Sequence, residues 1–78
     1  YTLYILRCKN NSLYTGITNN LEARLKKHSE GKGSKYVWAN KPFELVYTEH
    51  HSDKSSALKR EILVKSLTKI QKENLIKV

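Results

Sequence analysis

Residues 2–17 of the chain, TLYILRCKNNSLYTGI, have the pattern of a β-hairpin. Residues 2–8 and 13–17 are rich in leucine, isoleucine and tyrosine, and such runs predict strands. The polar residues 9–12 between them predict a turn, because asparagine tolerates left-handed backbone conformations. We therefore expect the chain to open with two antiparallel strands.

The length of the hairpin loop decides whether Tyr4 and Tyr14 share a face of the sheet. Side chains alternate between the two faces along a strand. A loop of two residues pairs Tyr4 with Ile17 and puts the two phenols on opposite faces, whereas a loop of three or five residues puts both on one face. The two tyrosines can act together only if the Asn10-Asn11 turn belongs to a loop of the second kind.

A helix, a loop, a strand and two helices follow the hairpin. We expect a helix over residues 21–28 that Asn19 or Asn20 caps, and then a basic loop over 31–42, with or without one helical turn. A strand over 43–48 follows, then a helix from near Asp53 or Ser55 to about Lys65, and a last helix capped by Thr68 that runs through Ile76. Alternation along the third strand puts Phe43, Leu45 and Tyr47 on one face. The expected fold is a single α/β (α+β) domain over residues 1–78, with a small three-stranded antiparallel sheet flanked by helices in the order ββαβαα.

The chain is strongly basic. It carries 15 lysines and arginines against seven aspartates and glutamates, a formal net charge of +8 over 78 residues. Nucleic acid is the first polyanion to consider as a partner for such a domain. The competing interpretation is a surface of lysines that only keeps the protein in solution, and charge alone leaves both open.

The single cysteine, Cys8, excludes an internal disulfide and a cysteine cluster for structural zinc. It fits a reducing compartment, most simply the cytoplasm. No apolar run approaches the roughly 20 residues that span a bilayer, so we expect no membrane segment. No signal peptide is visible at the start.

The helix expected over residues 21–28 carries an arginine and a histidine beside its apolar stripe. Leu21 and Leu25 form that stripe at about 100° per residue. Arg24 and His28 lie next to it, so their side chains should run along the edge of the core toward the sheet. Alternatively, Arg24 is an ordinary helix charge, and His28 is a surface histidine whose cationic form suits the helix C-terminus.

Glu61 stands on the apolar side of the helix after the third strand. The apolar arc of that helix consists of Ala57, Leu58, Ile62 and Val64. Glu61 falls inside the arc, and a carboxylate aimed at a core needs a compensating ion. It is either a ligand of one Mg²⁺ or Mn²⁺ ion, which takes hard oxygen ligands together with water and phosphates, or the partner of Lys65, four residues further on.

These residues together resemble the GIY-YIG nuclease family. Its first motif appears as residues 2–4, Thr-Leu-Tyr, which keep only the tyrosine, and its second as residues 14–16, Tyr-Thr-Gly, which keep the tyrosine and the glycine. The family's arginine, the histidine or tyrosine four residues later, and the glutamate on the helix after the third strand match Arg24, His28 and Glu61. The resemblance spans nearly the whole chain and is strongest to the very small, stand-alone bacterial branch.

The resemblance implies an endonuclease that hydrolyses phosphodiester bonds in DNA, with branched or damaged DNA as candidate substrates. A single Mg²⁺ or Mn²⁺ ion on Glu61 would polarise the scissile phosphate, and Arg24 would neutralise charge on the phosphorus. Of Tyr4 and Tyr14, one would take the proton from the attacking water and the other would position that water. His28 would donate to a phosphate oxygen or assist the base.

The basic loop supplies candidates for contact with nucleic acid. Lysines interleave there with aromatic residues, which suits phosphate contact and base stacking, and the candidates are Lys35, Tyr36, Trp38 and Lys41. Gly16 is a further candidate, because glycine within a strand lets another group, such as a substrate phosphate, come close to the backbone. The competing interpretation packs Tyr36 and Trp38 under the loop as a satellite core.

Two other classes of function stay open. The domain either binds DNA or RNA without cutting it, or it is an interaction module whose positive charge is incidental. We expect a monomer that binds DNA, with RNA as the alternative, and that needs no membrane. It either binds weakly by itself or is recruited by a partner protein.

Overall fold

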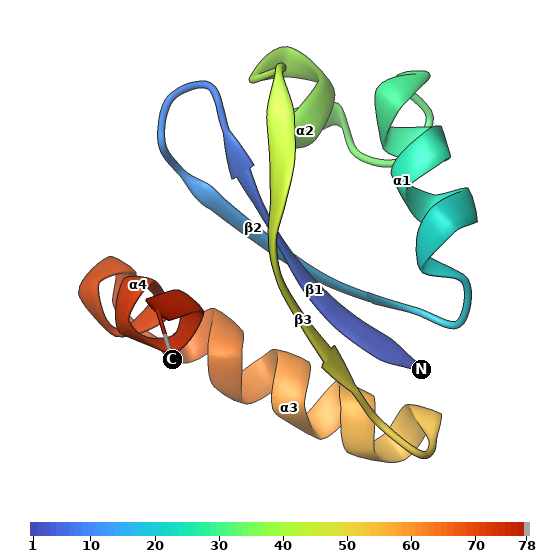
Figure 1. Ribbon diagram of the computed structural model, residues 1–78, viewed down its shortest axis with the longest axis vertical. Helices are drawn as coiled ribbons and strands as arrows, with labels where there is room; N and C mark the ends of the chain where they lie inside the picture. The colour runs from blue at the N-terminus through green and yellow to red at the C-terminus, as the bar shows by residue number, and fades with distance from the viewer. Residues whose placement is uncertain (78) are drawn as a thin grey trace.

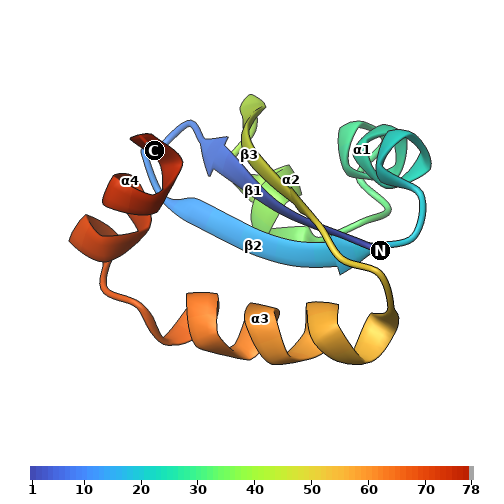
Figure 2. The same ribbon diagram turned by 60° about the horizontal axis from the view of Figure 1, so that its bottom comes forward.

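The chain forms a sheet with two helices on each face in the computed structural model, which describes residues 1–77 (Figures 1 and 2). The antiparallel sheet has the order β2-β1-β3 and consists of β1 (Thr2–Cys8), β2 (Leu13–Thr18) and β3 (Phe43–His50). One face carries α1 (Leu21–Ser29) and α2 (Lys35–Ala39), and the other carries α3 (Lys54–Ser66) and α4 (Lys69–Lys77). The predicted fold class is confirmed, and α2 is the short helical segment that the sequence left open within the basic loop. None of these helices is long and apolar enough to cross a bilayer.

The hairpin loop has the length that places both tyrosines on one face. Tyr4 lies opposite Gly16, which is two residues from Tyr14 on β2. At the loop, the amide of Asn11 donates to the carbonyl of Cys8 at 2.9 Å, and Asn11 has a φ of 66°. A turn followed by one residue in the left-handed conformation is the usual three-residue hairpin loop. The condition for cooperation between the two phenols is therefore met.

The pairing of β1 with β3 contains a β-bulge. Ile5 lies opposite Tyr47, but the next residue of β1 lies opposite Leu45. Val46 is therefore an extra residue on β3, and it reverses the alternation of side chains along that strand. The prediction that Phe43, Leu45 and Tyr47 share a face is wrong, because alternation presumes an unbroken strand.

Each face of the sheet buries its own hydrophobic cluster. The cluster under α1 and α2 contains the buried side chains of Tyr4, Leu6, Cys8 and Val37, with Phe43 packed against them. The cluster under α3 and α4 contains the buried side chains of Leu3, Ile5 and Val64, with Tyr47 packed against them. Alternate residues of β1 supply both clusters, so the central strand is buried on both faces.

Helix α1 directs Arg24 and His28 toward the sheet. Asn20 caps the helix, since its side chain accepts a hydrogen bond from the amide of Ala23 at 3.1 Å. His28 is buried and Arg24 is half-buried. His28 therefore belongs to the buried stripe itself, and the alternative of a surface histidine is wrong.

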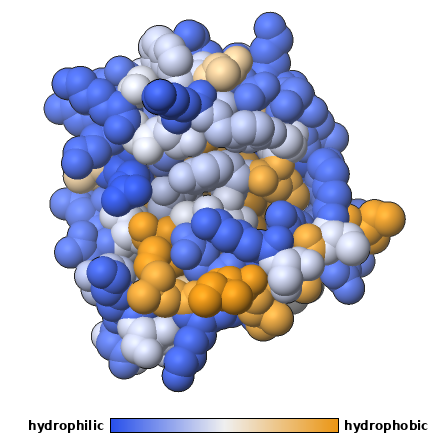
Figure 3. Space-filling view, turned by 180° about the vertical axis from the view of Figure 1, so that it is seen from behind, coloured by the Kyte–Doolittle hydropathy of each residue, from blue (hydrophilic) through white to orange (hydrophobic). Residues whose placement is uncertain are grey.

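Only half of the predicted apolar arc of α3 faces the sheet. Ala57 and Val64 are fully buried, whereas Leu58 and Ile62 are 39% and 69% exposed. Glu61 lies at helical spacing between the two buried residues, and its side chain is 17% exposed. The carboxylate therefore faces inward as predicted. Seen from behind, apolar side chains gather along the outer side of α3 (Figure 3).

Two ion pairs fasten the last two helices to the sheet. Arg7 of β1 donates hydrogen bonds to both carboxylate oxygens of Glu73 on α4, at 2.7 and 2.6 Å. Arg60 of α3 donates from Nε to both oxygens of Glu49 on β3, at 2.9 and 3.2 Å. Charge-assisted contacts of this kind restrict geometry as well as adding energy. They join α3 and α4 to the sheet at defined points.

Candidate active site

The phenol of Tyr4 lies across the backbone of β2 at Gly16. A Cβ atom at Gly16 would stand 2.6 Å from the hydroxyl oxygen of Tyr4 and 2.7 Å from its Cζ, whereas ordinary contact begins at 3.4 Å. Tyr4 is fully buried, so its ring has little room to move aside. The strand therefore needs glycine here to accommodate the phenol. Contact of Gly16 with nucleic acid stays a prediction.

His28 is packed between aromatic rings and a glycine. Its Nε2 is 3.0 Å from the hydroxyl oxygen of Tyr4, and its side chain is 1% exposed. The rings of Tyr14 and Phe43 approach it edge-on, with centroids 5.6 and 6.0 Å away. A Cβ atom at Gly33 would stand 2.5 Å from Nδ1, so this glycine lets the loop after α1 close over the imidazole.

Arg24 and Glu61 supply the charges around Tyr4 and His28. Burial and then Tyr14 raise the pKa of Tyr4 to about 12, with Glu61 acting in the same direction and the Arg24 guanidinium opposing them. Burial, followed by the charge of Arg24, lowers the pKa of His28. At neutral pH the pair is therefore a phenol and a neutral imidazole. The structure brings Tyr4, Tyr14 and His28 into contact, and the charges of Arg24 and Glu61 act on the Tyr4 phenol.

Glu61 is the carboxylate of this cluster. The Nζ atom of Lys65 lies 3.5 Å from its Oε2, which is longer than the roughly 2.7–3.2 Å of a hydrogen-bonded N–H···O pair. Its oxygens therefore retain capacity for a cation. Within residues 1–77 no group of three His, Cys, Asp or Glu could hold a metal. An ion at Glu61 would complete its shell with water and phosphate oxygens, as Mg²⁺ usually does, so the residues present fit such an ion.

The predicted contacts with nucleic acid lie on α2 and just after it. Val37 is buried under the helix, while Tyr36 and Trp38 are 45% and 43% exposed. Lys35 and Lys41 are exposed as well. Both aromatic residues thus keep nearly half of their surface in solvent, which argues against a satellite core made of Tyr36 and Trp38.

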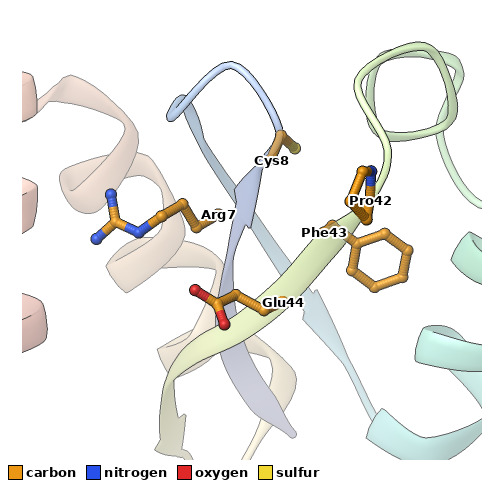
Figure 4. A pocket seen from close by; sticks show the side chains of 5 residues that line it. All are labelled: Arg7, Cys8, Pro42, Phe43 and Glu44. Atoms are coloured by element: carbon orange, nitrogen blue, oxygen red, sulfur yellow. The ribbon is translucent and has the colours of Figure 1, made fainter.

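Two hollows flank Phe43. One, of about 300 Å³, is lined by Arg7, Cys8, Pro42, Phe43 and Glu44 (Figure 4). Figure 4 shows Arg7 pointing toward α4 and the ring of Phe43 pointing the other way, toward α1. The other hollow, of about 290 Å³, is lined by His28, Ser29, Trp38, Lys41, Pro42 and Phe43. The second hollow borders the catalytic cluster, because the two share His28.

Sequence reasoning missed the contact that covers His28 and the ion pair that joins α3 to β3. Gly33 signalled only a loop, and its contact with His28 depends on the path of the chain after α1. Arg60 and Glu49 come from different elements, so no spacing along the sequence announces their hydrogen bonds. Both features depend on tertiary contacts, which patterns of neighbouring residues in the sequence do not reveal.

Comparison with known proteins returns one family. The GIY-YIG catalytic domain family matches residues 1–74. A UPF0213 protein of Staphylococcus haemolyticus is 49% identical over 74 residues, which are 95% of this chain and 90% of that protein. A UPF0213 protein of Clostridium perfringens is 51% identical over 74 residues, 95% of this chain and 80% of that protein. The solution NMR structure of a UPF0213 protein from Bacillus halodurans is 43% identical, with a TM-score of 0.64 over 97% of this chain and 81% of that chain.

Proposed function

The chain belongs to the GIY-YIG catalytic domain family, and from this premise we propose that it is an endonuclease that hydrolyses phosphodiester bonds in DNA with one divalent metal ion. One observation carries the proposal: the hydroxyl of Tyr4 is 3.0 Å from Nε2 of His28, and the charges of Arg24 and Glu61 act on this phenol. These groups supply three functions for hydrolysis. The phenol and the imidazole supply a base, the guanidinium stabilises negative charge on the phosphate, and the carboxylate is a metal ligand.

Tyr4 and His28 form the base. A phenol with a pKa of about 12 does not ionise at neutral pH, so Tyr4 needs an acceptor for its own proton. His28 accepts that proton at Nε2 when its own proton is on Nδ1, and burial keeps its imidazole neutral. The attacking water gives a proton to the phenol oxygen while the phenol gives its proton to Nε2. The water oxygen then forms the new bond to phosphorus as the bond to the leaving oxygen breaks.

Three further residues act on the phosphate and the attacking water, namely Arg24, Tyr14 and Glu61. The planar guanidinium of Arg24 donates to the phosphate oxygens as negative charge gathers on them. Tyr14 is half-buried, packs edge-on against His28 and shares a face with Tyr4, so it positions the attacking water. Glu61 would hold the metal ion, which would supply Lewis-acid stabilisation of the leaving oxygen.

Cleavage assays test the proposal directly. Labelled single-stranded, nicked, branched and fully paired DNA is incubated with Mg²⁺, with Mn²⁺ and with EDTA. We expect metal-dependent cleavage of at least one substrate, about 100-fold or more slower in Tyr4→Phe and His28→Ala, and lost in Glu61→Gln, which keeps the size of the side chain. Circular dichroism confirms that each variant is folded. Full activity of Glu61→Gln, or no cleavage by the wild type, refutes the proposal.

Binding of nucleic acid without hydrolysis is a second candidate. It is favoured by the complete burial of Tyr4, which restricts the access of water to its hydroxyl. In that case the wild type and Glu61→Gln bind DNA with the same salt-dependent affinity, and neither of them cleaves it.

A further inference from the structure

We propose that the hollow beside His28 is a pocket for one unpaired nucleobase, so that the enzyme selects DNA with an extruded or single-stranded nucleotide next to its catalytic cluster. This inference rests on the proposed function and names its substrate class. The pocket has a volume of about 290 Å³ and is lined by His28, Ser29, Trp38, Lys41, Pro42 and Phe43. Its position matters because Nε2 of His28 also contacts the hydroxyl of Tyr4, at 3.0 Å.

The walls of the pocket suit a flat aromatic ligand. Trp38 is 43% exposed, an unusual state for so large an apolar side chain. The ring of Phe43 points toward α1 and away from the hollow at Arg7, as Figure 4 shows. Together with Pro42, these rings offer apolar faces on which a base can stack.

The indole ring of Trp38 is held in a defined orientation. Gly31, with a φ of 78°, lies against it, and a Cβ atom there would stand 3.0 Å from Cδ2 of the indole. The ammonium of Lys41 lies over the ring, 3.7 Å from its centroid. A base that stacks on the face of Trp38 that Lys41 covers therefore replaces this ammonium.

This exchange favours the base. A cation over an exposed aromatic ring strengthens an interaction by about two- to fivefold, whereas a stacked base strengthens binding by about 5- to 150-fold. The four-carbon stem of Lys41 lets the ammonium swing from the ring to the phosphate of the same nucleotide. The lysine thus covers the aromatic surface in the free protein and contacts the backbone in the complex.

Polar groups at the pocket distinguish a nucleotide from an apolar peptide side chain. Lys41 brings positive charge to the pocket of a chain whose net charge is +8, which favours a ligand with a phosphate. The hydroxyl of Ser29 donates to the carbonyl of Lys26 at 2.7 Å and keeps lone pairs to accept from an exocyclic amino group. A base inside a duplex cannot enter, so the pocket selects unpaired bases.

Binding measurements in EDTA test the pocket without cleavage. The probe is a DNA duplex with a single unpaired 2-aminopurine, compared with the same duplex in which 2-aminopurine is paired. We expect about tenfold tighter binding of the unpaired probe, with quenching of its fluorescence by the indole. Trp38→Leu should lose this preference, and Trp38→Phe should keep most of it. Lys41→Gln should weaken binding of the unpaired probe more than Lys59→Gln, which removes the same charge from the exposed side of α3.

The outcomes separate the pocket from the proposed hydrolysis. Equal affinity for both probes without quenching overturns the pocket, even if metal-dependent cleavage of DNA is intact. The same holds if Trp38→Leu keeps the preference of the wild type. If Trp38→Leu does not fold, the wild-type comparison and the pair Lys41→Gln and Lys59→Gln decide the matter.

Discussion

Gly16→Ala is the substitution that most directly tests the geometry of the catalytic pair. The new methyl group would stand 2.6 Å from the hydroxyl oxygen of Tyr4, and ordinary contact begins at 3.4 Å. The buried ring must therefore move by about 0.8 Å, a clash of the kind that overpacked cores show. A displacement of this size along the line to His28 changes the 3.0 Å contact enough to break the hydrogen bond.

The expected loss of stability follows from that clash. Overpacking costs about 1–3 kcal/mol, and a domain of this size loses about 4–8 °C in melting temperature for each kcal/mol. We expect Gly16→Ala to melt about 8–16 °C below the wild type, which corresponds to about 2 kcal/mol. Where it is still folded, its cleavage rate should fall about 100-fold or more, because the base pair of Tyr4 and His28 is disrupted.

A double-mutant cycle supplies the control. In the background Tyr4→Leu no phenol crosses β2, so Gly16→Ala should cost less than about 0.5 kcal/mol there. Thermal melting followed by circular dichroism gives the stabilities, and cleavage of labelled DNA gives the activity. The reasoning fails if Gly16→Ala is as stable as the wild type, or if it costs the same in both backgrounds. A variant with native stability and weakened DNA binding would instead support the approach of a phosphate to Gly16.

Three further predictions concern charges. Lys65→Gln removes the ammonium that lies 3.5 Å from Glu61. Calorimetry should therefore show about two- to fivefold tighter binding of Mn²⁺ to the variant, since an ion pair this exposed contributes at most about 1 kcal/mol. An unchanged affinity for Mn²⁺ would contradict the ion site. Arg7 lowers the pKa of Glu73 to about 2, so this carboxylate stabilises the fold above its unfolded pKa, and the stabilisation is lost as pH falls toward 2. Glu73→Gln should therefore flatten the acid limb of melting temperature against pH, and parallel curves would refute this. Burial lowers the pKa of His28, so its imidazole stays neutral as the pH falls from neutral to about 6.5. The cleavage rate should therefore stay constant over this range. An inflection of the rate above about pH 6.5 would argue against a neutral imidazole as acceptor.

Much of the fold is determined by local sequence. The apolar runs on both sides of the Asn10-Asn11 turn predict the hairpin, and candidate caps just before the two helices predict where α1 and α3 begin to within two residues. The sequence leaves Asn19 or Asn20 open for the first cap and Asp53 or Ser55 for the second, and the structure uses Asn20 and Asp53. Local signals narrow the choice because capping, turn formation and hydrophobic period depend on residues close together in the chain. The residue types of the catalytic cluster are equally visible, through their spacing and their resemblance to the GIY-YIG family.

Tertiary packing decided the rest. The bulge at Val46 sends Phe43 and Tyr47 to opposite faces of the sheet, and pairing with β1 rather than the composition of β3 sets it. Helix α3 leaves Leu58 and Ile62 exposed and buries Ala57 and Val64, because its packing on the sheet decides which side of the helix faces inward.

The two tyrosines of the hairpin show which properties the sequence determines and which depend on tertiary structure. Their identity and spacing are properties of the sequence, and their shared face follows from a loop closed by Asn11 in the left-handed conformation. That Tyr4 reaches His28 depends on contacts between distant segments. Gly16 on the neighbouring strand leaves space for the phenol, and Gly33 lets a loop cover the imidazole. Steric fit between distant residues has no period along the chain, so only the folded structure reveals it.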